Sequence, residues 1–173
     1  MRKILLVIDM QNDFIDGALG TAEAVAMLPN AIEEIKKYPA ADVIATRDTH
    51  APDYMDTQEG KNLPVPHCIA GTHGWELNAD VAAALDGAEI IDKPTFGSRA
   101  LAEKLAAIAE QEELEITLIG LCTDICVVSN ALMIKAFLPE TKVSVIAACC
   151  AGVTPATHLA ALETMKMCQI NVI

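Results

Sequence analysis

The 173-residue chain predicts an α/β fold in which a six-stranded parallel sheet is covered by helices on both faces. Short apolar runs alternate with segments of helical period, which is typical of strands joined by crossover helices. The apolar runs show little polar alternation, which indicates strands buried on both faces. Hydrophobic side chains make up 53% of the chain, enough for one full core, so we expect a single domain over residues 1–173.

Six apolar runs predict the strands of this sheet. In chain order they cover residues 3–8, 42–46, 89–92, 115–121, 142–148 and 169–173. Each strand is separated from the next by a longer segment, so we expect parallel rather than hairpin pairing.

Five segments with helical period predict the helices between these strands. They cover residues 29–38, 78–86, 98–111, 126–138 and 155–167. The last has Thr154 as its expected N-cap and Pro155 at the first helical position, where the missing N–H has no partner to lose. Residues 48–74 contain three prolines and three histidines without periodicity, and this unusually long connection predicts a functional loop.

The composition argues against nucleic acid or an anionic membrane as a partner. A formal net charge of −12 and a pI near 4.6 leave no diffuse positive field that would attract phosphates. Asp9 interrupts the first apolar run before a signal peptide or a membrane span would be complete, so we expect a cytoplasmic protein. The six cysteines lie mostly in apolar surroundings, and a chain with a full core needs no disulfide framework, so we expect reduced thiols.

Polar residues follow four of the predicted strands where each strand ends. They are Asp9, the pair Asp48 and His50, Lys93, and the stretch 123–126. Parallel α/β sheets place their sites beyond the carboxyl ends of the strands, so we expect these residues to form one site. Each alone has a simpler explanation, because an acid there often caps a helix and a lysine is usually solvated.

The stretch GLCTDICV contains two cysteines with different expected roles. Cys126 falls in the first turn of the helix after the fourth strand, where free N–H groups and the helix dipole stabilise a thiolate. Cys122 falls at the end of the strand, where its side chain packs and its backbone N–H can join that of Cys126 in facing an oxyanion. Thr123 and Asp124 are interpreted as cap and turn residues. The alternative for Cys126 is an inert buried thiol.

A nucleophilic cysteine needs a proton acceptor, and histidine is scarce in this chain. Asp9 is the expected substitute, and Lys93 would hold the negative charge that passes between Asp9 and Cys126.

Three motifs resemble the isochorismatase-like cysteine hydrolases and, within that family, the nicotinamidases and pyrazinamidases. They are IDMQNDF, DKPTFGS and GLCTDICV, and the similarity covers essentially the whole chain. The resemblance implies a doubly wound three-layer sandwich with Asp9, Lys93 and Cys126 as a catalytic triad. It also implies a cis peptide between Leu121 and Cys122, which would aim the Cys122 N–H into an oxyanion hole shared with Cys126.

The long loop carries a candidate site for one divalent metal ion, of mixed oxygen and nitrogen donors suited to Zn, Mn or Fe. Its four expected ligands are Asp48, His50, Glu59 and His67. The resemblance implies the same pattern, an Asp-x-His pair, a third His or Glu, and a His after a proline. Asp53 and Asp56 compete with Glu59 for the third place. The alternative is that the two histidines only form hydrogen bonds.

The resemblance implies a cysteine-dependent amidohydrolase that converts nicotinamide and water to nicotinate and ammonia through a thioester. Phe14 and Phe96 lie in matched motifs and are the expected pocket residues, in a chain with only 3% aromatic residues. The placement of Trp75 is open. The resemblance also implies self-association into a homo-oligomer.

Three alternatives remain. Carbamoyl or ureido amidohydrolases of the same family keep the triad but generally lack the metal ligands, whereas isochorismatases lack the cysteine. A non-enzymatic thiol or metal sensor belongs to a different class, but the cysteine spacing does not form paired Cys-x-x-Cys knuckles. A nucleotide-binding module is disfavoured because no G-x-G-x-x-G follows a strand.

Overall fold

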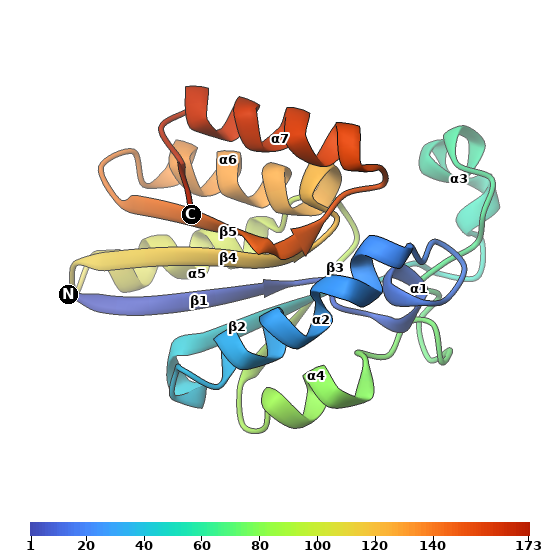
Figure 1. The fold of residues 1–173 in the computed structure, drawn as a ribbon, viewed down its shortest axis with the longest axis horizontal. Coiled ribbons are helices and arrows are strands. Elements are labelled where there is room, and N and C mark those ends of the chain that lie inside the picture. The colour runs from blue at the N-terminus through green and yellow to red at the C-terminus, as the bar shows by residue number, and fades with distance from the viewer.

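A parallel sheet of six strands forms the centre of the computed structural model, which describes residues 1–173 (Figure 1). The strands are β1 (Arg2–Ile8), β2 (Val43–Asp48), β3 (Glu89–Lys93), β4 (Leu114–Leu121), β5 (Lys142–Ala151) and β6 (Asn171–Val172). They lie in the order β3-β2-β1-β4-β5-β6, and every neighbouring pair is parallel. This is the doubly wound order, in which the chain changes direction across the sheet between β1 and β4. The predicted fold class is confirmed.

Helices cover both faces of the sheet (Figure 1). They are α1 (Asn12–Ile15), α2 (Ala22–Ile35), α3 (Gln58–Asn62), α4 (Ala79–Ala84), α5 (Arg99–Ala109), α6 (Val128–Phe137) and α7 (Pro155–Met167). Short turns of other helical types are η1 (Ala40–Asp42), η2 (Tyr54–Asp56) and the π-helical turn η3 (Thr123–Val127). Alternate residues of β1 pack toward α2 and α4 on one face and toward α5, α6 and α7 on the other.

Two strands meet closely at Gly120 in β4. Its φ is +120°, and a Cβ at this position would lie 2.1 Å from the carbonyl oxygen of Ile8. Only glycine therefore fits, and the close approach brings the end of β1 against the end of β4.

Helix α2 begins at Ala22 rather than at Pro29, so the predicted start of this helix was wrong. The Thr21 hydroxyl caps the helix by accepting the Ala24 N–H, and Pro29 lies inside it. A proline removes one backbone hydrogen bond and normally marks a helix start. Here the burial of Ala24 and Met27 against the sheet extends the helix beyond the proline.

The remaining helices follow the predicted pattern more closely. The expected cap of α7 is confirmed, since the Thr154 hydroxyl accepts the Thr157 N–H and Pro155 occupies the first helical position. Helix α5 is capped by Ser98. The long loop folds into η2 and α3, and the Tyr54 hydroxyl, which donates to the Leu63 carbonyl at 2.9 Å, holds these turns together. None of the helices combines the length and apolar character needed to span a membrane.

Candidate active site

The polar residues at the ends of β1, β2, β3 and β4 converge on the ammonium group of Lys93. Its Nζ lies 2.6 Å from Asp9 Oδ2, 3.5 Å from Asp48 Oδ1 and 3.5 Å from Cys126 Sγ. Each of the four side chains comes from a different strand or its following turn. The structure therefore brings together at the carboxyl edge the residues that the sequence placed there.

Asp9 is fully buried, with 0% of its surface exposed. The Thr46 hydroxyl donates to its Oδ1 at 2.6 Å, whereas Oδ2 is paired with the Lys93 charge without regular hydrogen-bond geometry. Burial and the nearby Asp48 charge raise the pKa of Asp9, although Lys93 and Thr46 oppose the rise. A carboxylate with a raised pKa is a better proton acceptor at neutral pH.

Lys93 remains a cation although only 1% of its surface is exposed. Burial would lower its pKa, but the negative charges of Asp9 and Asp48 outweigh burial and raise it. The ammonium also donates to the Thr95 carbonyl at 3.0 Å. A permanent positive charge thus lies between the thiol and the two carboxylates.

Cys126 lies in η3, the first turn of the helical segment that follows β4 and continues directly into α6, as predicted, but this turn is π-helical rather than α-helical. The Val127 N–H reaches back to the Cys122 carbonyl at 3.1 Å, which closes the wider turn ahead of α6. Burial and the Asp9 carboxylate raise the pKa of the Cys126 thiol well above its usual range, against the opposing effect of Lys93. Burial and Asp9 thus oppose ionisation of this thiol, so its reaction depends on a base that accepts the proton.

The peptide bond between Leu121 and Cys122 is cis, as the resemblance implied. The backbone N–H of Cys122 is not engaged in a hydrogen bond within the chain. Its thiol packs in the apolar core on one face of the sheet, and burial raises its pKa to about 12. Both thiols are thus poor acids, and what distinguishes Cys126 is its contact with Lys93 and Asp9.

Asp124 lies in the η3 turn as expected, but Thr123 is not the helix cap, because Cys122 occupies the N-cap position. The Thr123 hydroxyl forms a hydrogen bond with His158 Nδ1 at 2.8 Å, and the Asp124 carboxylate accepts the Val153 N–H at 3.0 Å. Their partners lie on α7 and the loop before it, which pack against η3. Tertiary contacts have replaced the local pattern and attach the Cys126 turn to α7.

The four expected metal ligands form a metal group next to the ion cluster of Asp9, Asp48, Lys93 and Cys126. Their donor atoms are all within 4.8 Å of one another, and they belong to Asp48, His50, Glu59 and His67. Asp53 and Asp56 are not part of the group. Two imidazoles and two carboxylates directed at one point fit a Zn, Mn or Fe ion by donor type and number.

The ionisable groups of this metal group lie close enough to shift one another's pKa. Burial would raise the pKa of Asp48, but His50, His67 and Lys93 outweigh it and hold that pKa well below its usual range. Asp48 Oδ2 lies 2.9 Å from His50 Nε2, while Oδ1 faces Lys93. Burial also raises the pKa of Glu59, with the Asp48 charge adding to the effect. Asp48 therefore belongs to both the ion cluster and the metal group.

Two supporting residues were missed in the sequence, although both lie in the IDMQNDF motif. The Gln11 side chain accepts the Asp48 N–H at 2.7 Å and donates to the Asp48 carbonyl at 2.8 Å. The Asp13 carboxylate accepts the Cys68 N–H at 2.8 Å and so fixes the chain directly after His67. The motif signals that these residues matter, but not which backbone groups they hold.

His67 is oriented by a backbone carbonyl. Its Nδ1 lies 2.8 Å from the carbonyl oxygen of Val65, which can only accept a hydrogen bond. Nδ1 therefore carries the proton and leaves the Nε2 lone pair free for a metal ion, which is the usual arrangement for a histidine ligand.

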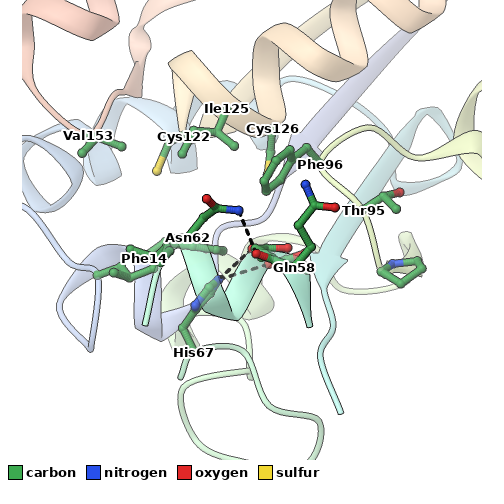
Figure 2. A pocket seen from close by; sticks show the side chains of 15 residues that line it. Phe14, Gln58, Asn62, His67, Thr95, Phe96, Cys122, Ile125, Cys126 and Val153 are labelled. Atoms are coloured by element: carbon green, nitrogen blue, oxygen red, sulfur yellow. Dashed lines mark hydrogen bonds and ion pairs between the residues drawn. The ribbon is translucent and has the colours of Figure 1, made fainter. Parts of the chain in front are cut away.

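A cavity of about 590 Å³ opens over the ion cluster and the metal group. Phe14 and Phe96 line it together with Cys126 and His67 (Figure 2). Three more residues that the sequence identified, Asp48, Glu59 and Cys122, also line it. The rest of the wall comes from residues that the sequence did not identify: Leu19, Gln58, Asn62, Leu63, Pro94, Thr95, Ile125 and Val153. Trp75 is not part of this wall. Its indole N–H donates to the Thr49 hydroxyl at 2.9 Å.

Known proteins share both the sequence pattern and the fold. The nicotinamidase/pyrazinamidase of Mycobacterium tuberculosis is 27% identical over 192 residues, which cover 99% of this chain and 98% of that protein. A crystal structure of a pyrazinamidase of Pyrococcus horikoshii in complex with zinc is 28% identical, with a TM-score of 0.80, and the match covers 100% of this chain and 99% of that one.

A second solved structure is similarly close, a nicotinamidase from Bacillus subtilis with 26% identity and a TM-score of 0.82, covering 99% of both chains. The isochorismatase domain model matches residues 3–173, which is nearly the full length of the chain. The chain therefore belongs to the isochorismatase family.

Proposed function

We propose that this protein is a cysteine amidohydrolase that converts nicotinamide and water to nicotinate and ammonia. The observation that carries the proposal is the contact of the Lys93 ammonium with both Asp9 and Cys126, beside a four-residue metal group in the same cavity. The similarity to proteins named nicotinamidase and pyrazinamidase supports the same activity. The activity would give the protein a role in NAD metabolism in the cytoplasm.

The metal ion would be held by Asp48, His50, Glu59 and His67. A bound Zn, Mn or Fe ion would supply a Lewis acid for a ring nitrogen of the substrate and for a water molecule. Zinc is supported by the zinc complex of the related pyrazinamidase.

The first half of the reaction forms a thioester. Asp9 accepts the proton of the Cys126 thiol, and Lys93 stabilises the negative charge as it moves between the two groups. The thiolate attacks the amide carbon, and the backbone N–H groups of Cys122 and Cys126 stabilise the oxyanion. Asp9 then returns the proton to the nitrogen, and ammonia leaves as the carbon–nitrogen bond breaks.

The second half regenerates the thiol. Water loses a proton to Asp9 and attacks the thioester carbon, and the carbon–sulfur bond breaks to release nicotinate. The departing thiolate takes the proton back from Asp9. The same base thus serves both steps, which requires a pKa near the working pH, and burial moves that of Asp9 in this direction.

A carbamoyl or ureido substrate is the second candidate. The observation that favours it is the aliphatic character of much of the cavity wall, to which Leu19, Leu63, Ile125 and Val153 contribute. A sensor is less well supported, since the metal group contains no cysteine. Assembly into a homo-oligomer stays a prediction.

The two cysteines are expected to respond differently to substitution. Cys126→Ala should lower kcat/KM for nicotinamide by at least about 10³-fold, because it removes the nucleophile. Cys122→Ala should remain within about tenfold of the wild type, since its proposed contribution is a backbone N–H. Steady-state ammonia release measures both, with circular dichroism to check folding. Comparable losses in the two variants would contradict this division of roles.

The metal content of the purified protein tests the proposed metal group. Elemental analysis of protein never exposed to chelators should find about one divalent metal ion per chain, and His50→Ala or His67→Ala should lose it. His73→Ala is the matched control, since the His73 side chain is 87% exposed and lies outside the group. Glu59→Gln should lower the metal content and Asp56→Asn should not. Metal-free wild-type protein would rule out the site.

Substrate choice tests the proposal as a whole. Ammonia release should be efficient with nicotinamide and pyrazinamide, whereas benzamide, which lacks the ring nitrogen, should fall by about 10²-fold or more in kcat/KM. Without a ring nitrogen to bind the metal ion, the substrate loses the orientation that makes attack by Cys126 effectively unimolecular. A carbamoyl amino acid, a ureido acid and isochorismate complete the panel. Turnover of a carbamoyl compound without turnover of nicotinamide would keep the triad chemistry and disprove the nicotinamidase assignment.

A further inference from the structure

We infer that Asn130 is a positioning residue that holds the Cys126 turn and the Phe96 wall of the cavity in fixed relation to each other. The inference rests on the proposed function, because it concerns the placement of the proposed nucleophile. Asn130 lies in α6, with only 1% of its surface exposed, and it does not line the cavity.

All of the hydrogen-bonding groups of the Asn130 carboxamide are directed at backbone atoms of the site. Its Oδ1 accepts the Ser98 N–H at 2.9 Å. Its Nδ2 donates to the carbonyl oxygens of Phe96 at 3.1 Å and of Cys126 at 2.8 Å. One buried side chain therefore joins three points, two in the loop between β3 and α5 and one at the nucleophile itself.

The loop between β3 and α5 packs against α6 and contributes to the cavity wall. It follows Lys93, whose ammonium donates to the Thr95 carbonyl, and it carries Phe96 into the cavity wall. A Cβ on Gly97 would lie 2.9 Å from Met133 Cε and 3.3 Å from the Ser129 carbonyl oxygen, so the loop backbone lies directly against α6. The loop thus depends on α6 for its position.

The other end of the connection is the nucleophile turn. Asn130 follows Cys126 by four residues, so its side chain reaches back along the helix to the Cys126 carbonyl. That carbonyl belongs to the wide π-helical turn that carries the nucleophile. The Asn130 amide therefore links the position of Sγ to that of the loop that begins at Lys93, and the 3.5 Å contact between Lys93 Nζ and Sγ depends on both.

Two substitutions separate the two connections. Asn130→Thr keeps a hydroxyl that can donate to the carbonyl four residues earlier, that of Cys126, but cannot reach Phe96 and Ser98. Asn130→Ala loses all three bonds. Because the loop carries the cavity wall, both variants should raise KM for nicotinamide by about tenfold, while kcat should stay within about threefold in the threonine substitution and fall about tenfold or more in the alanine substitution.

Ile134→Ala is the matched control for a purely structural role. Ile134 lies one turn further along α6 with 1% of its surface exposed, and it packs in the core away from the cavity. At a temperature where all variants are folded by near-ultraviolet circular dichroism, its kcat and KM should match the wild type. Unchanged kinetics in both Asn130 variants, or changes no larger than those of Ile134→Ala, would overturn the inference.

Alkylation of Cys126 by iodoacetamide, followed by peptide mass spectrometry, tests the same point without any substrate. The rate should fall by about threefold or more in Asn130→Ala, since the thiolate depends on the nearby Lys93 charge, and should be unchanged in Ile134→Ala. Because alkylation needs no substrate, it separates the positioning role of Asn130 from the proposed amidohydrolase activity. A wild type that releases no ammonia from any amide, with alkylation slowed in Asn130→Ala alone, refutes the amidohydrolase and supports the positioning role. If the wild type releases ammonia and Asn130→Ala is alkylated as fast as the wild type, the positioning role is refuted and the amidohydrolase proposal stands.

Discussion

The buried ammonium of Lys93 is the charge on which the arrangement of the carboxyl edge depends. Burying an ion of this size costs several kcal/mol, which only close opposite charges and hydrogen bonds offset. Asp9 and Asp48 supply those charges from the ends of β1 and β2; β2 lies beside β3 in the sheet, and β1 is the next strand along. The sheet order thus places two acids beside one buried lysine. Removing Asp9, whose Oδ2 lies 2.6 Å from Nζ, would take away the closest counter-charge of a buried ion, at a cost of about 3–5 kcal/mol.

The same ammonium explains why the site is ready for proton transfer. It keeps Asp9 able to ionise although burial raises the pKa of that group, and it meets the thiol of Cys126 at 3.5 Å. Asp48 extends the cluster, because one of its oxygens faces Lys93 and the other faces His50. A positive ion in the metal group would therefore act on the field at the nucleophile through a single shared carboxylate.

The sheet and the convergence of Asp9, Asp48, Lys93 and Cys126 could be predicted because both follow from local apolar runs and from the parallel connection of strands. The start of α2 could not, since packing against the sheet carried the helix through Pro29. The choice of Glu59 over Asp56 depended on how the loop folds into η2 and α3.

The hydrogen bonds of Gln11 and Asn130 could not be predicted either, because each joins backbone atoms that are remote in sequence. The hydrogen-bond partners of an amide side chain depend on the fold and cannot be inferred from the neighbouring sequence. The motifs therefore indicated which residues react, while the residues that hold the reacting groups in place became visible only in the folded chain.

Interception of turnover with hydroxylamine tests the central claim, that the ion cluster makes Cys126 a nucleophile that forms a thioester. During nicotinamide hydrolysis, hydroxylamine should compete with water for the acyl group, so nicotinohydroxamate should appear at the expense of nicotinate while ammonia release continues. Formation of nicotinate alone at every hydroxylamine concentration, with undiminished ammonia release, would mean that water attacks the amide directly and would contradict the account.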